Sequence, residues 1–232
     1  MSNVLEDLQK IQAIDNRRDA LEQKILRKTK EKNLLEEERK HLEEDLQRLE
    51  QDLERARLAL ARKELELKEV EEKWKATKDK LYSGEITSSK ELAQWEKSMK
   101  KLEETKDHLE NEILSEMEKV ENLQREFRKK SEEVSEKRVF LTQQIEAKEA
   151  EIAALEREVA ASEGERRSIA ASIPSEILAR YEELRRKFQD AVVPLAGEVC
   201  QGCHLSVPTI VAKAVRKREG LVRCPNCGRF LH

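Results

Sequence analysis

Apolar residues recur at alternating steps of three and four along the first third of the chain. In the series that runs from Ile11 to Leu81, fifteen of the twenty-one positions are apolar. This spacing keeps one stripe of a helix facing a partner helix, as in a coiled coil. The series consists of Ile11, Ile14, Arg18, Leu21, Ile25, Lys28, Lys32, Leu35, Arg39, Leu42, Leu46, Leu49, Leu53, Ala56, Leu60, Lys63, Leu67, Val70, Trp74, Thr77 and Leu81.

A second series of the same kind starts at Leu92 and continues to Leu141. The pattern then moves by four residues to Ile145 and continues to Ile169. Such a step is a stutter, which unwinds a supercoil locally without ending the helix. We therefore predict a second long helix. Its polar exceptions are Lys106, Glu116, Lys130 and Lys137.

The segment between the two series carries signals for a helix end and a helix start. Gly84 suits the end of a helix, and Ser88 followed by Glu91 forms a capping box. The arms on either side have nearly equal lengths, so folding back here gives an antiparallel coiled-coil hairpin about 120 Å long. We predict this hairpin over residues 1–173, with its tip at about 82–88. Two parallel helices in a homodimer remain the alternative.

Basic residues interrupt the first apolar series near its start, at Arg18, Lys28, Lys32 and Arg39. Long basic side chains can leave a two-helix seam while their stems cover apolar surface. The interpretation that we favour is therefore ion pairing within the coil. A weakened segment that docks another molecule is the alternative.

The hairpin is predicted to end before Pro174, because proline disfavours helical geometry in the residue that precedes it. Residues 174–232 then form a second region. We expect a linker helix over 175–189, a strand over 191–195, a short helix opened by Pro208, and a last strand at 230–231. The short helix carries Ile210, Val211, Ala214 and Val215.

Four cysteines in this second region form two Cys-x-x-Cys pairs separated by twenty residues: Cys200, Cys203, Cys224 and Cys227. Two residues between cysteines let one tight turn aim both sulfurs at one tetrahedral Zn²⁺, and four thiolates close its coordination shell. We predict one structural zinc. Gly228 is expected to take a positive φ behind the second pair, with Gly202 in a similar role in the first.

Other uses of the cysteines fit less well. Two disulfides would need an oxidising compartment, and the amino terminus has no secretion-signal pattern, so we expect a cytoplasmic location. A redox pair would need a βαβ context, and a catalytic zinc keeps an open position. His204 and His232 are expected to lie on the surface rather than replace a ligand.

The composition limits what the rest of the chain can be. Charged residues make up 41% of the sequence and aromatic residues only 3%, which leaves too little apolar mass for a globular core of this size. Such a composition is also typical of disorder, but the helical periodicity argues against it. The predicted fold class is mainly α: a long antiparallel coiled-coil hairpin plus a small C-terminal zinc ribbon.

Charge is divided unevenly along a chain whose net charge is −3. From Val199 onward six basic residues face only one acidic residue, Glu219. Such a basic surface can contact phosphates, although the same charges also suit a solvated face. Nucleic-acid binding and a plain solvated surface both remain open here. The basic residues are Lys213, Arg216, Lys217, Arg218, Arg223 and Arg229.

Several of these segments together resemble a bacterial family of four-cysteine zinc-ribbon proteins with a long coiled-coil hairpin, and the resemblance covers essentially the whole chain. The two cysteine knuckles are its most specific part. The matching segments are Leu81-Tyr82-Ser83-Gly84, Lys90-Glu91-Leu92, Ile173-Pro174, Tyr181-Glu182-Glu183-Leu184-Arg185, Cys200-Gln201-Gly202-Cys203-His204 and Cys224-Pro225-Asn226-Cys227-Gly228-Arg229-Phe230-Leu231.

The resemblance implies zinc ligands at the four cysteines and no enzyme activity. It also implies nucleic-acid binding, and in some bacteria a link to flagellar or secretion systems through protein partners, including an alternative sigma factor, and through messenger RNA. The aromatic residue that usually closes the family's last strand is replaced here by His232.

We therefore expect a cytoplasmic, non-enzymatic adaptor that binds a protein partner, RNA or DNA, with no membrane partner and no small-molecule substrate. The sequence has no paired carboxylates, nucleophile–base set or phosphate loop, which argues against an enzyme. A structural spacer or chaperone-like scaffold in a flagellar or secretion system is the alternative. The heptads leave the oligomeric state open.

Overall fold

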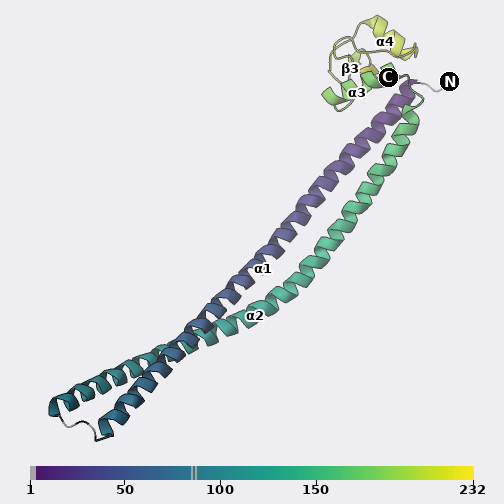
Figure 1. Cartoon of the computed structure of the whole chain (residues 1–232). Helices are drawn as coiled ribbons and strands as arrows, with labels where there is room; N and C mark the ends of the chain where they lie inside the picture. The colour runs from purple at the N-terminus through teal and green to yellow at the C-terminus, as the bar shows by residue number, and fades with distance from the viewer. Residues whose placement is uncertain (1–3, 85, 87) are drawn as a thin grey trace. The chain divides into compact units, whose positions relative to one another are not determined.

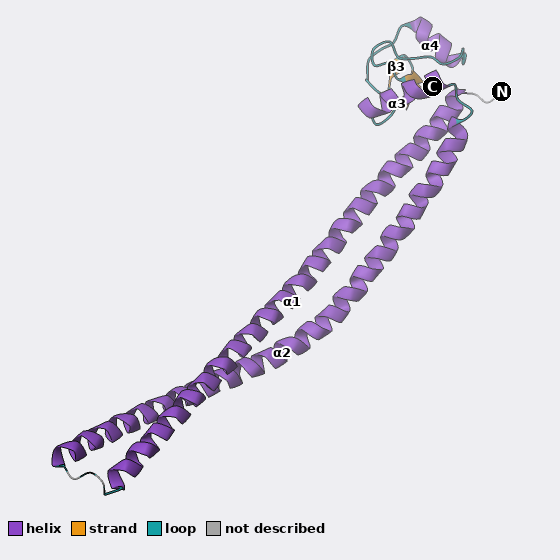
Figure 2. Cartoon of the chain, viewed as in Figure 1, coloured by secondary structure: helices purple, strands orange, loops and turns teal. Residues whose placement is uncertain are grey.

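The computed structural model describes residues 4–84, 86 and 88–232. Two long helices, α1 (Val4–Tyr82) and α2 (Ser89–Ala170), are followed by the shorter helix α3 (Ser175–Lys187) (Figure 1). Figure 2 shows that helix dominates the chain, with strand confined to its C-terminal part. The chain forms two compact units, Met1–Leu34 with Ile145–His232, and Leu35–Gln144.

The long helices run antiparallel within each unit, as their ion pairs show. In the first unit Arg17, Lys28 and Lys32 of α1 pair with Glu158, Glu151 and Glu149 of α2. In the second, Glu38, Lys63 and Glu71 pair with Lys137, Glu112 and Lys106. Residue numbers rise along α1 as they fall along α2. The predicted hairpin is therefore confirmed, and the arrangement of parallel helices is wrong.

The predicted seam is the side of α1 that α2 covers. None of its positions from Ile11 to Leu81 is exposed, and Leu53 and Ala56 are buried. On α2 both residues that bound the four-residue step, Leu141 and Ile145, are buried. Leu92, at 40% exposed, and Lys137 are the predicted seam residues on α2 that remain exposed.

Three of the four basic seam residues pair within the coil, as the favoured interpretation expected, whereas Arg39 forms no ion pair among the described residues. Lys28 Nζ lies 2.7 Å from a carboxylate oxygen of Glu151, and Lys32 Nζ lies 3.5 Å from one of Glu149. Arg18 Nη1 lies 3.8 Å from Glu163. In this stretch of the seam, ion pairs thus supplement the packing of buried apolar residues such as Leu21 and Ile145.

The turn between the long helices follows the predicted signals. Gly84 has a φ of +79°, a conformation that glycine adopts without steric cost. The backbone N–H of Leu92 donates to the carbonyl oxygen of Ser88 at 3.0 Å, which places Ser88 at the start of α2. The predicted tip at 82–88 also includes Glu85 and Thr87, which lie outside the described residues.

The C-terminal region contains four two-residue strands: β1 (Val192–Val193), β2 (Leu195–Ala196), β3 (Val199–Cys200) and β4 (Phe230–Leu231). β1 pairs with β4 in parallel, and β2 pairs with β3 antiparallel. The single strand predicted over 191–195 is wrong, because Pro194 divides it into β1 and β2. Proline has no backbone N–H to donate to a ladder.

The short helix α4 (Thr209–Arg216) begins after Pro208, as predicted. Its apolar residues do not all face the core. Ala212 faces the interior and is buried, whereas Ile210, about half a turn away, is 77% exposed. The short side chain of Ala212 is what fits beneath this helix.

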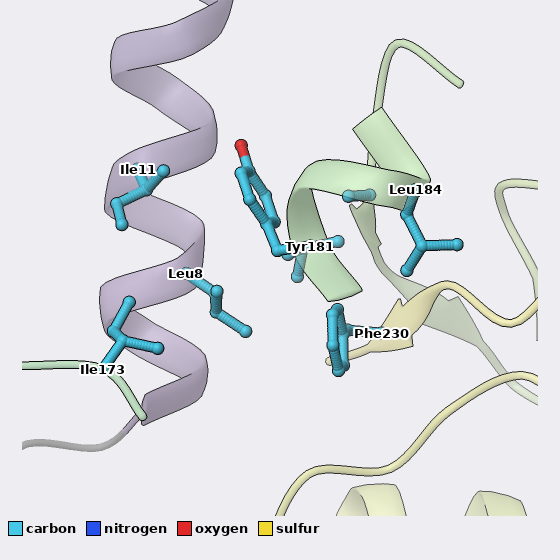
Figure 3. Packing of buried hydrophobic residues seen from close by; sticks show 8 residues of the cluster. Leu8, Ile11, Ile173, Tyr181, Leu184 and Phe230 are labelled. Atoms are coloured by element: carbon cyan, nitrogen blue, oxygen red, sulfur yellow. The ribbon is translucent and has the colours of Figure 1, made fainter. Parts of the chain in front are cut away.

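One hydrophobic core joins the start of α1 to the C-terminal region. Figure 3 shows the side chains of Leu8, Tyr181 and Phe230, contributed by α1, α3 and β4. Ile11 and Ile173 belong to the same cluster. Phe230 is therefore a core residue and cannot serve as an exposed stacking platform.

Polar contacts reinforce this junction. The side-chain oxygen of Gln12 accepts hydrogen bonds from the backbone N–H groups of Ala191 and Val192 at 2.8 and 2.7 Å, and its nitrogen donates to the carbonyl of Val192 at 2.7 Å. The hydroxyl of Tyr181 donates to the buried carboxylate of Asp15 at 2.8 Å. Burial, with the Asp15 charge, raises the pKa of Tyr181.

No helix among the described residues is long and apolar enough to cross a membrane.

The ion pair between Glu31 and Lys148 leads to a pH-dependent prediction. Hydrogen bonds from Lys148, at 2.7 Å, and from Arg27, at 3.1 Å, lower the pKa of Glu31 to about 2. A carboxylate whose pKa is lowered by folding stabilises the folded state above its unfolded pKa, and the contribution is lost as the pH falls through the folded value. In Lys148→Met we expect the Glu31 pKa to rise, as measured by NMR titration.

The same substitution should lower the melting temperature slightly at pH 6, since an exposed pair contributes little. The difference from the wild type should vanish as the pH approaches 2. Lys24→Met removes an exposed lysine with no partner among the described residues and serves as the control. An unchanged Glu31 pKa in Lys148→Met would contradict the prediction.

Candidate metal centre

The four predicted cysteines come together at one point in the C-terminal region. Their sulfur atoms all lie within 4.8 Å of one another. The Sγ atoms of Cys200 and Cys227 are 3.9 Å apart, and those of Cys203 and Cys224 are 3.8 Å apart. A tetrahedral zinc with Zn–S bonds of about 2.3 Å has sulfur–sulfur edges of about 3.8 Å. The donor set therefore fits one Zn²⁺ in both chemistry and size.

Each cysteine pair sits on the same backbone turn. The N–H of His204 donates to the carbonyl of Cys200 at 2.8 Å, and that of Gly228 donates to Cys224 at 2.8 Å. In the opposite direction, the N–H of Cys200 donates to Leu205, and that of Cys224 to Arg229. The two knuckles are thus one structural unit used twice.

The positive φ of the first knuckle does not lie at the predicted residue. Gly228 has a φ of +75°, as predicted, but in the first knuckle the positive value belongs to His204, at +58°, and not to Gly202. Both residues directly follow the second cysteine of their pair. Comparing the two knuckles position by position would have identified His204.

Gly202 has a different role, which is to leave room for Arg229. A Cβ atom at Gly202 would lie 2.2 Å from Nη1 and 2.8 Å from Cδ of Arg229. The guanidinium of Arg229 in turn lies 4.0 Å from the ring centroid of Phe188, at the end of α3. This stack fastens the second knuckle to the linker helix.

A second small core surrounds the sulfurs. Cys200 and Cys224 are buried with Val193, Val207, Ala212 and Leu231. Burial raises the pKa of Cys200, and it raises that of Cys227 to about 12, whereas a hydrogen bond from the backbone of Leu205 lowers that of Cys203. A bound zinc would supply the positive charge that four neighbouring thiolates require.

His204 and His232 are exposed and do not join this cluster.

The six basic residues singled out in the sequence have different environments. Arg216 donates to the carbonyl of Gly197 at 3.2 Å, and Lys217 lies 3.5 Å from Glu219. Arg229 stacks on Phe188. The other three, Lys213, Arg218 and Arg223, are exposed and have no ion pair among the described residues.

Both parts of this architecture match known families. Residues 7–189 match the CT398-like coiled coil hairpin domain, which covers well over half of the chain. The chain belongs to the CT398-like coiled-coil hairpin family. Residues 199–231, which include all four cysteines, match the C4-type zinc ribbon domain. Neither of these two family descriptions is that of a catalytic domain.

Three solved structures share this fold. CT398 from Chlamydia trachomatis has a TM-score of 0.86, with 99% of this chain and 97% of that one covered. A protein from Mycobacterium smegmatis has a TM-score of 0.75 with coverage of 100% and 99%, and HP0958 from Helicobacter pylori one of 0.58 with 99% and 96%. Each is 20% identical to this chain. No curated protein matches the sequence significantly.

Removing zinc should unfold the ribbon and spare the distal coil. The strands have two residues each, so they depend on the metal and the cores around it, whereas the seam of Leu35–Gln144 contains none of the cysteines. We expect one zinc per chain by elemental analysis. After chelation, or in Cys224→Ser, the backbone amides of residues 191–232 should lose their protection from hydrogen exchange. The amides of Leu35–Gln144 should keep theirs. Less than about half an equivalent of zinc, with protection unchanged by chelation, would contradict this.

His204 and Gly228 occupy equivalent positions in the two knuckles, and substitutions there should change the stability of the ribbon in opposite directions. A non-glycine residue in the left-handed region costs roughly 1–2 kcal/mol, while glycine costs about 0.5–1 kcal/mol of chain entropy. His204→Gly should therefore stabilise the ribbon by about 0.5 kcal/mol and slow the release of zinc to a chromophoric chelator. Gly228→Ala, at the equivalent position, should speed release. Faster release from His204→Gly would show that the imidazole makes a contact that the ribbon needs.

Proposed function

We propose that this chain is a non-enzymatic adaptor that binds a protein partner through the outer face of its zinc ribbon. The hairpin and ribbon domains, and the two family descriptions, support a binding role in preference to catalysis. A cytoplasmic location is part of the proposal. The observation that carries it is the exposed surface of α4.

α4 presents an apolar side chain to solvent beside two positive charges. Ile210, Lys213 and Lys217 recur at helical spacing and are all exposed, with Ile210 at 77%. Leu205, which follows the first knuckle, is 54% exposed. These two are the large apolar side chains that the described part of the ribbon leaves in water. Apolar anchors within a polar rim are typical of a protein interface.

The ribbon is also firmly mounted, which favours a role in presenting a surface. Gln12 of α1 makes three hydrogen bonds to Ala191 and Val192, and Phe230 shares a core with Leu8 and Tyr181. An interface that is rigid before binding loses less conformational entropy when the partner docks.

The ribbon is less well suited to nucleic acid than its charge suggests. Its aromatic residue, Phe230, is buried, so no base can stack on it. Arg216, Lys217 and Arg229 have intramolecular partners, which leaves Lys213, Arg218 and Arg223 as the basic residues of the ribbon that are unpaired among the described residues. Nucleic-acid binding by the ribbon is therefore the second candidate. A pure spacer is the third, and it would not need exposed apolar residues on the ribbon.

A quantitative pulldown from nuclease-treated host lysate can separate these functions. The bait proteins are the wild type, Ile210→Ser and the triple variant Lys213, Arg218 and Arg223→Gln. We expect a discrete set of proteins that Ile210→Ser loses at least about tenfold, since burying a large apolar side chain contributes about 1.5–3 kcal/mol. The control is Leu65→Ser, which removes a 62% exposed leucine from the arm.

The remaining outcomes would overturn the proposal in distinct ways. Enriched RNA or DNA from untreated lysate that the triple variant loses, with no protein lost by Ile210→Ser, would make the ribbon a nucleic-acid-binding module. Loss of the same proteins with Leu65→Ser would show that capture depends on general exposed apolar surface. If no bait captured any molecule, the remaining function would be that of a structural spacer.

A further inference from the structure

The helix ends that flank the hairpin turn carry an excess of lysine, bounded by Glu71 and Glu72 on α1 and by Glu103 and Glu104 on α2. Residues 73–101 contain eight lysines, no arginine and four acidic residues, in a chain whose net charge is −3. All eight lysines are exposed. We call them the tip lysines: Lys73, Lys75, Lys78, Lys80, Lys90, Lys97, Lys100 and Lys101.

The tip lysines are almost entirely without acidic partners. Ion pairs occur repeatedly along the rest of α1 and α2, but among the described residues the tip lysines make one, between Lys73 and Glu69 at 3.9 Å. Lys78 and Lys80 lie over the rings of Trp74 and Trp95, at 4.8 and 5.1 Å from the centroids. The other five tip lysines have no ion pair or ring contact among the described residues.

Four of the tip lysines form a line on one side of α2. Lys90 and Lys97 are two helical turns apart, and Lys100 and Lys101 follow Lys97 at the spacing that keeps them on the same side. This side is opposite the seam residues Trp95 and Met99. At about 1.5 Å per residue the line is about 16 Å long, which suits several successive phosphates of one strand.

An exposed aromatic residue lies at the end of α1 next to this charge. Tyr82 is the last residue of α1 and is 73% exposed. An exposed ring can stack on an unpaired base, and such stacking tolerates any sequence. Arginine, which reads guanine edges and clamps phosphates with two hydrogen bonds, is absent from this segment.

We propose that the hairpin tip binds single-stranded nucleic acid without sequence preference, through the lysine line of α2 and the ring of Tyr82. A membrane surface fits less well. Between Lys90 and Lys101 the lysine side of α2 presents Ala93 and Gln94, whereas Leu92, which is 40% exposed, lies on the opposite side of the helix and would not face the same membrane surface as the lysines. This surface is separate from the ribbon face proposed above, because it belongs to Leu35–Gln144.

Fluorescence anisotropy of the full chain with a labelled 20-nucleotide oligothymidylate tests this proposal. We expect binding that weakens with salt, and in Lys97, Lys100 and Lys101→Gln a slope of log affinity against log salt that is smaller by about 2. Tyr82→Ala should weaken binding about fivefold or more through lost stacking. An oligonucleotide of mixed sequence should bind with similar affinity.

Two further triple variants act as controls. Lys24, Lys30 and Lys68→Gln removes the same charge from exposed arm lysines that have no ion pair among the described residues, and it should bind like the wild type. Lys213, Arg218 and Arg223→Gln should also bind normally, and a loss there would place binding on the ribbon. Circular dichroism checks that each variant remains helical.

Three results would overturn the proposal. One is the absence of oligonucleotide binding at low salt. Another is an equal loss from the tip and arm triple variants, which would indicate general electrostatics. The third combines two observations: the wild type and the tip triple variant bind the oligonucleotide equally, but only the wild type binds vesicles of anionic phospholipid. That result would make the tip a membrane-binding surface.

Discussion

The ladder between β1 and β4 is the constraint on which the C-terminal part of this structure depends. It has two residues in each strand, and the two pairs face opposite sides because side chains alternate along a strand. Val192 and Phe230 lie in the core with Leu8 and Tyr181, whereas Val193 and Leu231 lie in the core around the cysteines. One minimal sheet thus connects the coil to the metal centre, and neither core is complete without it.

Gln12 explains how so short a sheet is held in place. A two-residue strand leaves backbone groups unpaired at its free edge, and unpaired groups are costly when buried. The side-chain amide of Gln12 bonds the N–H and the carbonyl of Val192, as a neighbouring strand would. The first turns of α1 therefore act as part of the ribbon, although about 180 residues of sequence separate them. This arrangement ties the zinc ribbon to the coil instead of leaving it as a separate module.

The features that the sequence predicted are those set by local chemistry. Seam positions follow from helical period, and the cysteine knuckles follow from two fixed spacings, so the amino-acid sequence alone is enough to predict both. The polar contacts of the junction could not be predicted, because a lone Gln12 or Asp15 on a charged helix gives no sign of its distant partner. His204 was missed because histidine, unlike glycine, does not indicate a positive φ. The buried side of α4 could not be predicted, because Ala212, which is buried, is less apolar than Ile210, which is exposed.

Two groups of lysines in the arm differ in their partners: some form ion pairs between α1 and α2, whereas others near the turn have no ion-pair partner among the described residues. At Lys28 and Lys32 positive charge replaces apolar seam residues, and carboxylates of α2 neutralise it. Lys97, Lys100 and Lys101 have no such partners among the described residues, so their charge contributes nothing to the hairpin and repels itself at low salt. On the ribbon, α4 packs Ala212 against the core that holds Cys200 and Cys224, so its outer face is ordered only while that core is intact. The tip lysines belong to Leu35–Gln144, which contains none of the cysteines.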